Sequence, residues 1–440
     1  MEIEKLKQKI LDLAIRGKLV PQDPNDEPAS VLIDRIRAEK EELIKQGKIK
    51  RSKEDSYIYK GSDNCYYEKV GDNETKIDFK EPITTSGCIW MQGYQIFKPM
   101  QSVGKIYSET IDYIDIDAID NKENKIKCAK NILSKNAPSR AKRKVENGST
   151  LFSMVRPYLR NIAYVEEQYE HCVASTGFYV CTPQFFIVPK YLYYLMISPY
   201  VVSGINFYMK GDNSPSVRSE QIESFLFPIP SLERQRKIAK FLDTVFNKIN
   251  LLKSDISQLN SSIAQLKIKI LDDIFGENSR YKSYYENSYL LGDILEYEQP
   301  AKYIVESTEY SDDYETPVLT PGKTFILGYT NEKDGIYRVN GDTVIIFDDF
   351  TTASRIVDFD FKIKSSAMKI LTVSDTLKFD IEYLYYLLQT IKVNNNTHKR
   401  YWISEFATKA LYIHTIEQQK EIVNSINSTF ALLDKMSSSI

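Results

Sequence analysis

The chain contains an internal repeat, and this repeat limits its possible folds more than any other feature does. Residues 229–256 align without gaps to residues 413–440, at an offset of 184 positions, and Gln235 matches Gln419 in this alignment. The string YLYYL also occurs twice. Because self-similarity of this kind marks repeated structural units, the sequence predicts two related halves.

A second, shorter repeat stands in a different order. LKQKILD at residues 6–12 recurs as LKIKILD at residues 266–272, an offset of 260 positions. The N-terminus therefore copies the segment that follows the first long repeat, as though a two-unit repeat had been cut inside one unit. This order predicts that the two chain ends lie together, so that the two terminal segments form the counterpart of the continuous segment at residues 229–276. The molecule would then have approximate twofold symmetry.

The apolar residues of the repeated segments have the spacing of a coiled coil. Between residues 231 and 275 they recur every three or four positions, at Ile238, Leu242, Val245, Ile249, Leu252, Ile256, Leu259, Ile263, Leu266 and Ile270. The matching positions at the chain ends are Ile3, Leu6, Ile10, Ile422, Ile426, Thr429, Leu433, Met436 and Ile440. Of these, Thr429 alone is not apolar. This pattern predicts a helix roughly 67 Å long at about 1.5 Å per residue. We expect it to pair antiparallel with a helix split between the two ends. A coiled coil that only dimerises the protein is the alternative.

The regions between these helices alternate short apolar segments with turn signals, and each ends in a Tyr-rich helix. In region one, roughly residues 80–228, the segments IWMQGYQIF, STLFSMV, NIAYVEE and GFYVCTP precede PKYLYYLMISPYVVSG. In region two, TVIIFDDF, SRIVDFDF and AMKILTV precede DIEYLYYLLQTI. Each region closes with a polar, basic loop, MKGDNSPSVRSEQ or NNNTHKRYWISE. The predicted fold class is therefore α+β, with two pseudo-twofold-related mixed α/β domains separated by a pair of long antiparallel coiled-coil helices.

These features divide the chain into six segments. Residues 17–60 belong to neither copy and are expected to form an extended connector and a charged helix that packs on the core, with partner docking as the alternative. The predicted boundaries are 1–16 for the distal half of the split helix, 17–60 for the inserted connector and charged helix, 61–228 for the first domain, 229–276 for the central long helix, 277–412 for the second domain and 413–440 for the C-terminal helix that pairs with the N-terminus.

Composition is that of an ordinary soluble globular protein. The 440 residues, 42% apolar and 27% charged, suffice for two or three domains with buried cores. No apolar run is long enough to span a membrane, and the N-terminus lacks the apolar core of a secretory signal, so we expect a cytoplasmic protein. The five cysteines are odd in number and never spaced CxxC, which argues against a disulfide framework or a zinc site.

Charge is nearly balanced overall, at a net −2, but it is uneven along the chain. Residues 122–160 contain eleven Lys or Arg against two acidic residues, whereas residues 293–315 contain eight acidic residues against Lys302 alone. A local basic patch is a better indicator of a nucleic-acid partner than the total charge is.

No catalytic or metal-binding motif stands out. The GKT at residues 322–324 has the ending of a Walker A loop, but Pro317 replaces the required glycine. No NPPY or DPPY tetrapeptide marks an adenine methyltransferase, and the faintly nuclease-like acidic residues around Glu123 are attributed to chance. The three histidines are too scattered for a metal site or a triad. The sequence therefore predicts a binding surface without catalytic residues or a metal.

Three runs carry a resemblance to a known family. GKLVPQDPNDEPASVLIDRIRAEKEELIKQGKIK, APSRAKRKVENGSTLFSMVRPYLRNIAYV and IPSLERQRKIAKFLD resemble the DNA-specificity subunit of type I restriction-modification systems. The resemblance covers essentially the whole chain. It implies two target-recognition domains separated by two antiparallel conserved helices with circular pseudo-symmetry, which is the layout that the repeats predict.

The resemblance also implies a function for which this chain needs no catalysis of its own. Each target-recognition domain would read one half of a bipartite, asymmetric site in double-stranded DNA. The helices would set the number of unread base pairs and dock two methyltransferase subunits, and restriction/translocase subunits would complete the complex. S-adenosylmethionine, ATP and Mg²⁺ would be held by those partners, with no cofactor in this chain.

Candidate DNA-binding residues follow from charge and from position in loops, because Lys and Arg bind phosphates while Arg, Asn, Gln, Ser and Thr bind base edges. In the first domain they are Ser139, Arg140, Lys142, Arg143, Arg156, Arg160, Lys210, Asn213, Ser214 and Arg218. In the second domain they are Lys302, Lys323, Thr351, Thr352, Arg355, Lys364, Lys399 and Arg400. We expect Asp348 and Asp349 mainly to hold a loop in place.

Two other functions stay open at this point. One is a coiled-coil scaffold protein without base readout, and the other is an enzyme with an unrecognised site in region one. Sequence-specific binding at two separated half-sites that weakens steeply with salt would favour DNA recognition. DNA cleavage or methylation by the chain alone would favour the enzyme.

Overall fold

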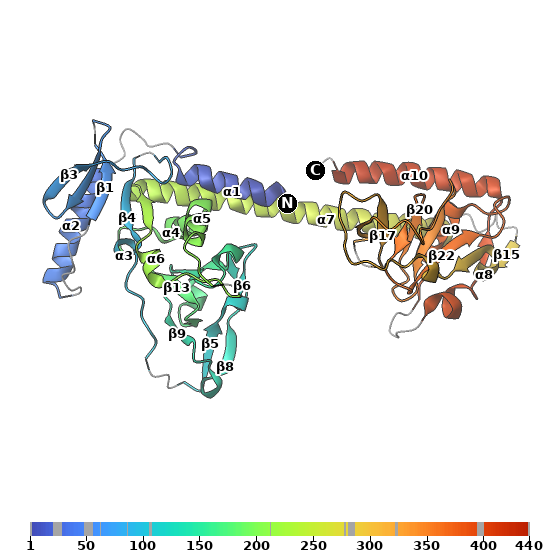
Figure 1. Cartoon of the computed structure of the whole chain (residues 1–440), viewed down its shortest axis with the longest axis horizontal. Helices are drawn as coiled ribbons and strands as arrows, with labels where there is room; N and C mark the ends of the chain where they lie inside the picture. Colours follow the sequence, from blue (N-terminus) through green and yellow to red (C-terminus); the bar gives the residue numbers. More distant parts are fainter. Residues whose placement is uncertain are drawn as a thin grey trace. The chain divides into compact units, whose positions relative to one another are not determined.

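The computed structural model divides into two compact units, Met1–Leu251 and Leu252–Ile440. It describes residues 2–20, 29–47, 56–61, 63–85, 87–104, 108–211, 213–276, 279, 287–321, 324–393 and 400–438. Both units mix helices with sheets (Figure 1), in agreement with the predicted α+β class.

Unit 1 begins with two helices and continues with mostly β structure. Its elements are α1 (Glu2–Ile15), α2 (Ala29–Lys45), β1 (Ser56–Lys60), β2 (Tyr66–Val70), β3 (Asn73–Ile77), β4 (Ile89–Gln92), α3 (Gly93–Ile96), β5 (Thr110–Ile114), β6 (Ile119–Asp120), β7 (Lys125–Ile126), β8 (Lys130–Leu133), β9 (Ala141–Lys144), β10 (Thr150–Ser153), β11 (Ile162–Tyr164), β12 (Val173–Ser175), β13 (Phe178–Cys181), α4 (Pro189–Met196), α5 (Pro199–Asn206), α6 (Ser219–Glu223), β14 (Leu226–Ile229) and the first half of α7 (Leu232–Phe275).

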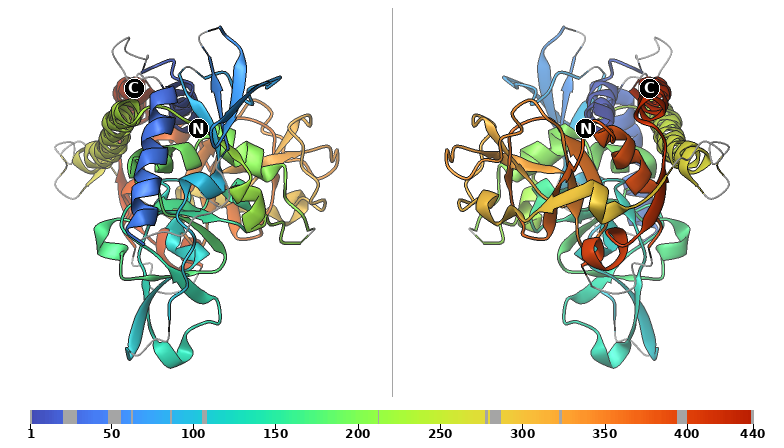
Figure 2. Two further views of the ribbon diagram at one scale, coloured as in Figure 1. Left: turned by 90° about the vertical axis from the view of Figure 1, so that its left-hand side faces the viewer. Right: turned by 90° about the vertical axis from the view of Figure 1, so that its right-hand side faces the viewer.

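The strands of unit 1 form a five-stranded sheet in the order β14-β4-β1-β2-β3, a four-stranded sheet β8-β5-β12-β9 and a three-stranded sheet β11-β10-β13. Figure 2 shows α2 beside the strands β1–β3, and Ile33 and Ile36 of α2 are buried. Helix α2 of the inserted segment thus contributes to the core of unit 1. The sequence pattern predicts that Val31, Leu32, Ile36 and Leu43 pack there, and Ile36 does, but Val31 is 43% exposed.

Two parts of unit 1 differ from the sequence prediction. The four-stranded sheet was not predicted, because strands such as Lys130–Leu133 and Ala141–Lys144 are rich in lysine and have no apolar run. The Tyr-rich segment that was expected to be one helix is two, because Ser198 caps α5 by accepting from the Val201 N–H at 3.3 Å and Pro199 follows at the first helical position.

Unit 2 repeats the plan with fewer strands. Its elements are the second half of α7, β15 (Asn287–Leu290), α8 (Leu291–Ile294), β16 (Leu295–Glu298), β17 (Thr316–Leu319), β18 (Ile326–Thr330), β19 (Val344–Asp348), β20 (Ser354–Val357), β21 (Lys362–Ile363), β22 (Met368–Val373), α9 (Ile381–Thr390), a π-helical turn (Trp402–Phe406), β23 (Ala410–Ile413) and α10 (Ile416–Ser438). The sheets are β16-β22-β19-β20, β18-β17-β21 and β15-β23.

The internal repeat is visible in a buried glutamine of unit 1. Gln235, fully buried near the start of α7, donates through Nε2 to the Phe186 and Pro230 carbonyls at 3.2 and 2.9 Å. Its Oε1 accepts from the Val188 N–H at 2.8 Å, at the start of α4. One side chain thereby joins the long helix to both the strand before it and the Tyr-rich helix.

Gln419, the matching residue, makes the same contacts in unit 2. Its Nε2 donates to the Lys378 and His414 carbonyls at 2.9 and 2.8 Å, and its Oε1 accepts from the Asp380 N–H at 2.7 Å, at the start of α9. Because His414 follows Pro230 by the same 184 positions as Gln419 follows Gln235, the sequence repeat corresponds to a repeated hydrogen-bond network.

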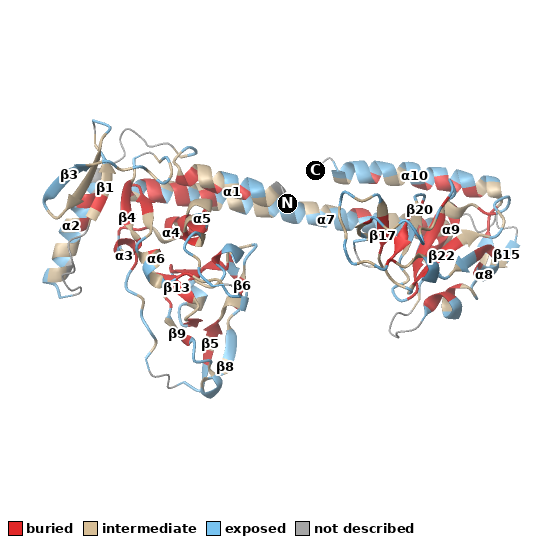
Figure 3. Ribbon diagram, viewed as in Figure 1, coloured by how far each residue is buried: buried red, intermediate tan, exposed pale blue. Residues whose placement is uncertain are grey.

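Burial along α7 is greatest toward its two ends (Figure 3). Ile238 and Leu242 are buried with α1 in the core of unit 1, while Leu271 is buried with α10 in the core of unit 2. Between them Leu252 is 59% exposed, so the predicted seam is buried only in part. In the split helix Leu6 is 50% exposed, contrary to the prediction.

The helix pairing in each unit is antiparallel, as predicted. In unit 2, Lys267 Nζ lies 2.7 Å from Asp434 Oδ1, and the Ser437 hydroxyl donates to Asn260 Oδ1 at 2.6 Å, so α10 runs backward along α7. In unit 1, Arg234 donates through Nη2 to the Val20 carbonyl at 3.2 Å, beyond the end of α1.

Candidate nucleic-acid interface

Two loops that are far apart in the sequence meet in unit 1. The loop between β10 and β11 contacts the loop before α6, because the Val217 N–H donates to the Met154 carbonyl at 2.9 Å and the Arg156 N–H donates to the Pro215 carbonyl at 2.8 Å. The Arg156 guanidinium also donates to the Asn213 carbonyl at 2.9 Å. Two groups of predicted DNA-binding residues are therefore brought together.

A third segment adjoins these loops through the turn between β12 and β13. The Met154 N–H donates to the Gly177 carbonyl at 2.9 Å, and the Thr176 N–H donates to the Arg140 carbonyl at 2.8 Å. The turn before β9 is thereby linked to the β10–β11 loop. We call the described residues of these three connected segments, 139–143, 154–156, 210–211 and 213–218, the basic loop surface.

Most of the predicted DNA-binding residues on the basic loop surface are exposed to solvent. Arg140, Lys142, Lys210 and Arg218 are exposed, and none of the four forms an ion pair within the part of the chain that the structure describes. Ser139, Asn213 and Ser214 are also exposed, while Arg143 is partly buried. Unpaired cations at exposed loops suit phosphate binding, because no internal pair must be broken first.

Arg160 is placed differently from the other predicted residues. It donates through Nη2 to Gln8 Oε1 at 3.0 Å and to the Ile197 carbonyl, so its guanidinium joins α1 to the end of α4. Burial lowers the pKa of this guanidinium below its ordinary value, against the opposing charge of Glu4. Since its Nη2 is engaged within the protein and the side chain is partly buried, the structure gives Arg160 a packing role, and its DNA contact stays a prediction.

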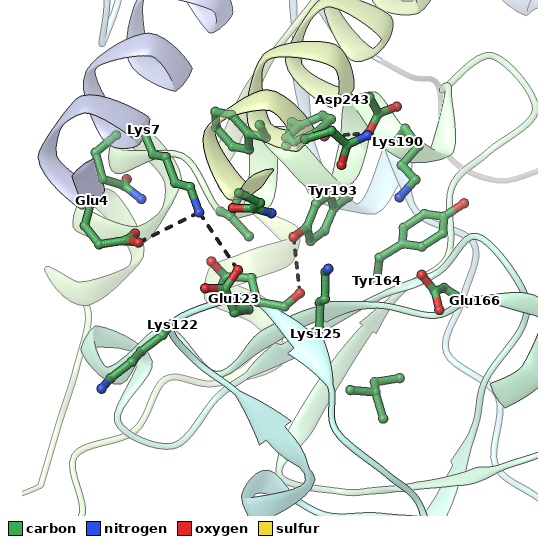
Figure 4. Close-up of a pocket in the computed structure, with 18 of the residues that line it drawn as sticks. Glu4, Lys7, Lys122, Glu123, Lys125, Tyr164, Glu166, Lys190, Tyr193 and Asp243 are labelled. Atoms are coloured by element: carbon green, nitrogen blue, oxygen red, sulfur yellow. Dashed lines mark hydrogen bonds and ion pairs between the residues drawn. The ribbon is translucent and has the colours of Figure 1, made fainter. Parts of the chain in front are cut away.

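A cavity of about 150 Å³ lies between α1, α4, α7 and the β6–β7 hairpin (Figure 4). Lys7, only 7% exposed, points into it and lies 3.8 Å from Glu4 and 3.9 Å from Glu123. The Tyr193 hydroxyl donates to the Asn124 carbonyl at 3.2 Å. Lys7 is thereby paired with carboxylates from α1 and from the hairpin, so we interpret the cavity as a place where α1 packs against the hairpin.

In unit 2 the predicted residues are more dispersed. Lys302 pairs with Glu298 at 3.5 Å, Arg355 lies over the Phe325 ring at 5.6 Å, and Lys364 lies over the Tyr310 ring at 5.7 Å. Arg400 is exposed, and Thr351 and Thr352 form the turn between β19 and β20. Lys323 and Lys399 lie outside the described residues.

The two acidic residues of region two hold that turn, as expected. Asp348 accepts from the Phe350 N–H at 3.1 Å and from the Thr351 hydroxyl. Asp349 accepts from the Trp402 N–H at 2.7 Å and lies 3.3 Å from Lys369 Nζ, with both charged side chains buried. Charges buried this deeply are stabilised by their partners and are not available to DNA.

Phe350, at the same turn, was missed by the sequence reasoning. Its side chain is 46% exposed between the buried Asp349 and the exposed Thr351. The sequence feature that could have identified it is a large aromatic residue within the polar string DDFTTAS. An aromatic side chain at the tip of a solvent-exposed turn has no core to pack against, so it suggests a binding role.

Within the described ranges the chain shows neither a cluster of metal ligands nor a membrane-spanning helix. No group of three or more His, Cys, Asp or Glu side chains there is arranged to hold a metal ion. None of the described helices combines the length and apolar character needed to cross a membrane. The five cysteines are free thiols.

Comparison with known proteins locates the basic loop surface inside a recognised domain. The family described as type I restriction modification DNA specificity domain matches residues 98–261. A specificity subunit of the type I restriction enzyme EcoR124I/EcoR124II from Escherichia coli is 49% identical over 147 residues, which are 33% of this chain and 36% of that protein. The EcoAI specificity subunit from Escherichia coli is 72% identical over 51 residues, 12% of this chain and 9% of that protein.

A solved structure agrees over a longer stretch. A chain from work on the complex assembly and conformational transition of the type I R-M system covers 80% of this chain and 92% of its own length, with a TM-score of 0.62 and 21% identity, which shows a shared fold. The sequence alignments span about a third or less of the two curated relatives above. Residues 98–261 thus match the type I restriction modification DNA specificity family, and the resemblance of the chain to the specificity subunits of type I restriction-modification systems is confirmed.

Proposed function

We propose that this chain is the sequence-specific DNA-recognition subunit of a type I restriction-modification complex. Each unit reads one half of a bipartite, asymmetric site, and the long helices set the spacing and dock the methyltransferase subunits. The chain contributes recognition, while methyl transfer and ATP-driven restriction belong to partner subunits that hold S-adenosylmethionine, ATP and Mg²⁺.

The observation that carries this proposal is the basic loop surface. Arg140, Lys142, Lys210 and Arg218 come from segments up to 78 positions apart, yet hydrogen bonds between their loops bring these segments together. All four are exposed and lie within the matched domain. Loops fixed to one another by backbone hydrogen bonds present cations at defined positions, which is what register on a DNA backbone requires.

Salt dependence of DNA binding tests this assignment. In the complex assembled with methyltransferase subunits, substitution of Arg140, Lys142 and Lys210 together by Ala should leave up to three DNA phosphates without a bound cation. The slope of log Kobs against log salt should then become less negative by about 0.9 for each phosphate that these side chains no longer neutralise.

A matched control uses three exposed lysines of the β1–β3 region, Lys60, Lys76 and Lys80. Their substitution by Ala removes the same charge and should leave the salt slope nearly unchanged. Equal slopes for the two triple variants would contradict the proposal. Retention of partner assembly without any DNA binding by the wild-type complex would favour a scaffold instead.

A further inference from the structure

The turn between β19 and β20 in unit 2 corresponds in position to the β10–β11 loop of unit 1. In unit 1 the Val217 N–H donates to the Met154 carbonyl at 2.9 Å, and in unit 2 the Tyr401 N–H donates to the Asp349 carbonyl at 3.0 Å. Val217 and Tyr401 are separated by the same 184 positions as the repeated helices. The turn of unit 2 therefore occupies the place that residues 154–156 of the basic loop surface take in unit 1.

The tip of this turn is held in one conformation by hydrogen bonds. Asp348 accepts from the Phe350 N–H through its side chain and from the Thr352 N–H, at 2.9 Å, through its carbonyl. Thr352 has a φ of 62°, a left-handed conformation that is uncommon for a β-branched residue. Such a backbone persists only where its surroundings support it, and here the Asp348 carbonyl binds the Thr352 N–H while the Asp348 carboxylate binds the two residues before Thr352.

The base of the turn is equally fixed. Asp349 is 1% exposed and Lys369 is fully buried, and their charged groups lie 3.3 Å apart. The Trp402 N–H donates to Asp349 from the segment that closes the domain. The turn is thus anchored to β22 and to the closing segment, so that a side chain at its tip is held in place before DNA binds.

Phe350 is the large side chain at this tip. It is 46% exposed, and no ring contact to it is found among the residues that the structure describes. A phenyl ring has no hydrogen-bonding group, so it cannot read the donors and acceptors of a base edge. In the major groove the apolar group that distinguishes a base is the C5-methyl of thymine, which Phe can contact.

We propose, on the basis of the function proposed above, that Phe350 determines specificity in the half-site read by unit 2 by contacting a thymine methyl group. The fixed turn places the ring, and the ring favours an A·T pair at one position of that half-site. Unit 1 carries Arg156 in its corresponding loop, so the two units read different bases at this place.

The test uses duplexes in which single thymines of the recognised site are replaced by uracil, which lacks only the methyl group. With the wild-type complex, replacement of one thymine in the half-site of unit 2 should weaken binding by about fourfold, as expected when one methyl-sized apolar group is no longer withdrawn from water. The Phe350→Ala complex should bind the thymine and uracil duplexes equally. Phe350→Leu, which keeps an apolar contact, should retain part of the difference.

Leu377→Ala provides the matched control. Leu377 is 84% exposed and follows the end of β22 that is distant from the turn, beside the Lys378 carbonyl that Gln419 binds. This variant should keep the full response to uracil, because it removes an exposed apolar side chain away from the turn. An unchanged uracil response in Phe350→Ala, or no thymine whose methyl group matters, would overturn the inference.

The outcome also separates this inference from the proposed function. If the wild-type complex binds a bipartite site but shows no methyl dependence, only the role of Phe350 fails. If the wild-type complex shows no sequence preference, the proposed function fails, whatever Phe350 does.

Discussion

Asp349 and Lys369 show how the sequence can hide a residue's role. In the printed sequence Asp349 is one of two acids in a polar turn and Lys369 is one of many lysines, and hydropathy alone would place both at the surface. The fold buries them as an ion pair, because β19 and β22 pair directly, with Asp348 opposite Met368 and Phe347 opposite Lys369. That pairing across 20 positions is not visible from local pattern.

Replacement of Lys369 tests how much the Asp349–Lys369 ion pair stabilises the turn. Lys369→Met leaves the Asp349 carboxylate buried without a cation, which should lower the free energy of unfolding by about 3–5 kcal/mol. Urea unfolding of the full chain measures this decrease. Lys392→Met is the control, since the Lys392 side chain is 84% exposed and its pair with Asp272 at 3.6 Å should contribute about 0–1 kcal/mol. Equal decreases in the two variants would contradict a supporting role for the buried pair.

Among the helices and strands, those with a periodic apolar pattern or a repeated sequence can be predicted from the sequence. The long helix, the Tyr-rich helices and strands such as Val344–Asp348 were predicted, because apolar spacing and turn residues identify them. The four-stranded sheet of unit 1 was not, since its strands Lys130–Leu133 and Ala141–Lys144 are short and largely polar. The loops carrying Arg140 and Lys210 were predicted as basic, but their meeting depends on tertiary hydrogen bonds.

Loss of the repeated glutamine should destabilise the elements that its side chain joins. Gln419→Ala should leave buried or partly buried backbone groups of His414, Lys378 and Asp380 without a partner, at about 1–3 kcal/mol for each buried group. Native-state hydrogen exchange should then show reduced protection in α9 and β23, with unit 1 unchanged. Gln265→Ala, at an exposed position of α7, should leave protection as in the wild type. Reduced protection in both units alike would show that the two networks are not local.

At the scale of the whole molecule, one continuous element connects the two units in the chain. Helix α7 contains 44 residues, equivalent to about 66 Å at 1.5 Å per residue. The order of the repeats predicted this organisation. The role that we propose for loops such as the β19–β20 turn could not be predicted, because it depends on contacts between segments distant in the sequence.

If the long helix sets the half-site spacing, its length determines the number of unread base pairs between the half-sites. One heptad inserted into residues 250–260 of α7, with a matching heptad in the split helix, adds about 10 Å. The unread gap in the recognised site should lengthen by about three base pairs at roughly 3.4 Å each. Sequencing of methylated DNA from cells expressing the variant complex gives the gap directly, and an unchanged gap would contradict this role of the helix.

The central claim is that this chain determines where its complex acts on DNA. Its most direct test is single-molecule sequencing of adenine methylation in cells that express the chain with its modification subunit, compared with cells that lack the chain. We expect a new bipartite motif with methylated adenines on both strands, present only in the cells that express the chain. An assembled complex that methylates DNA with the same pattern whether or not the chain is present would contradict it.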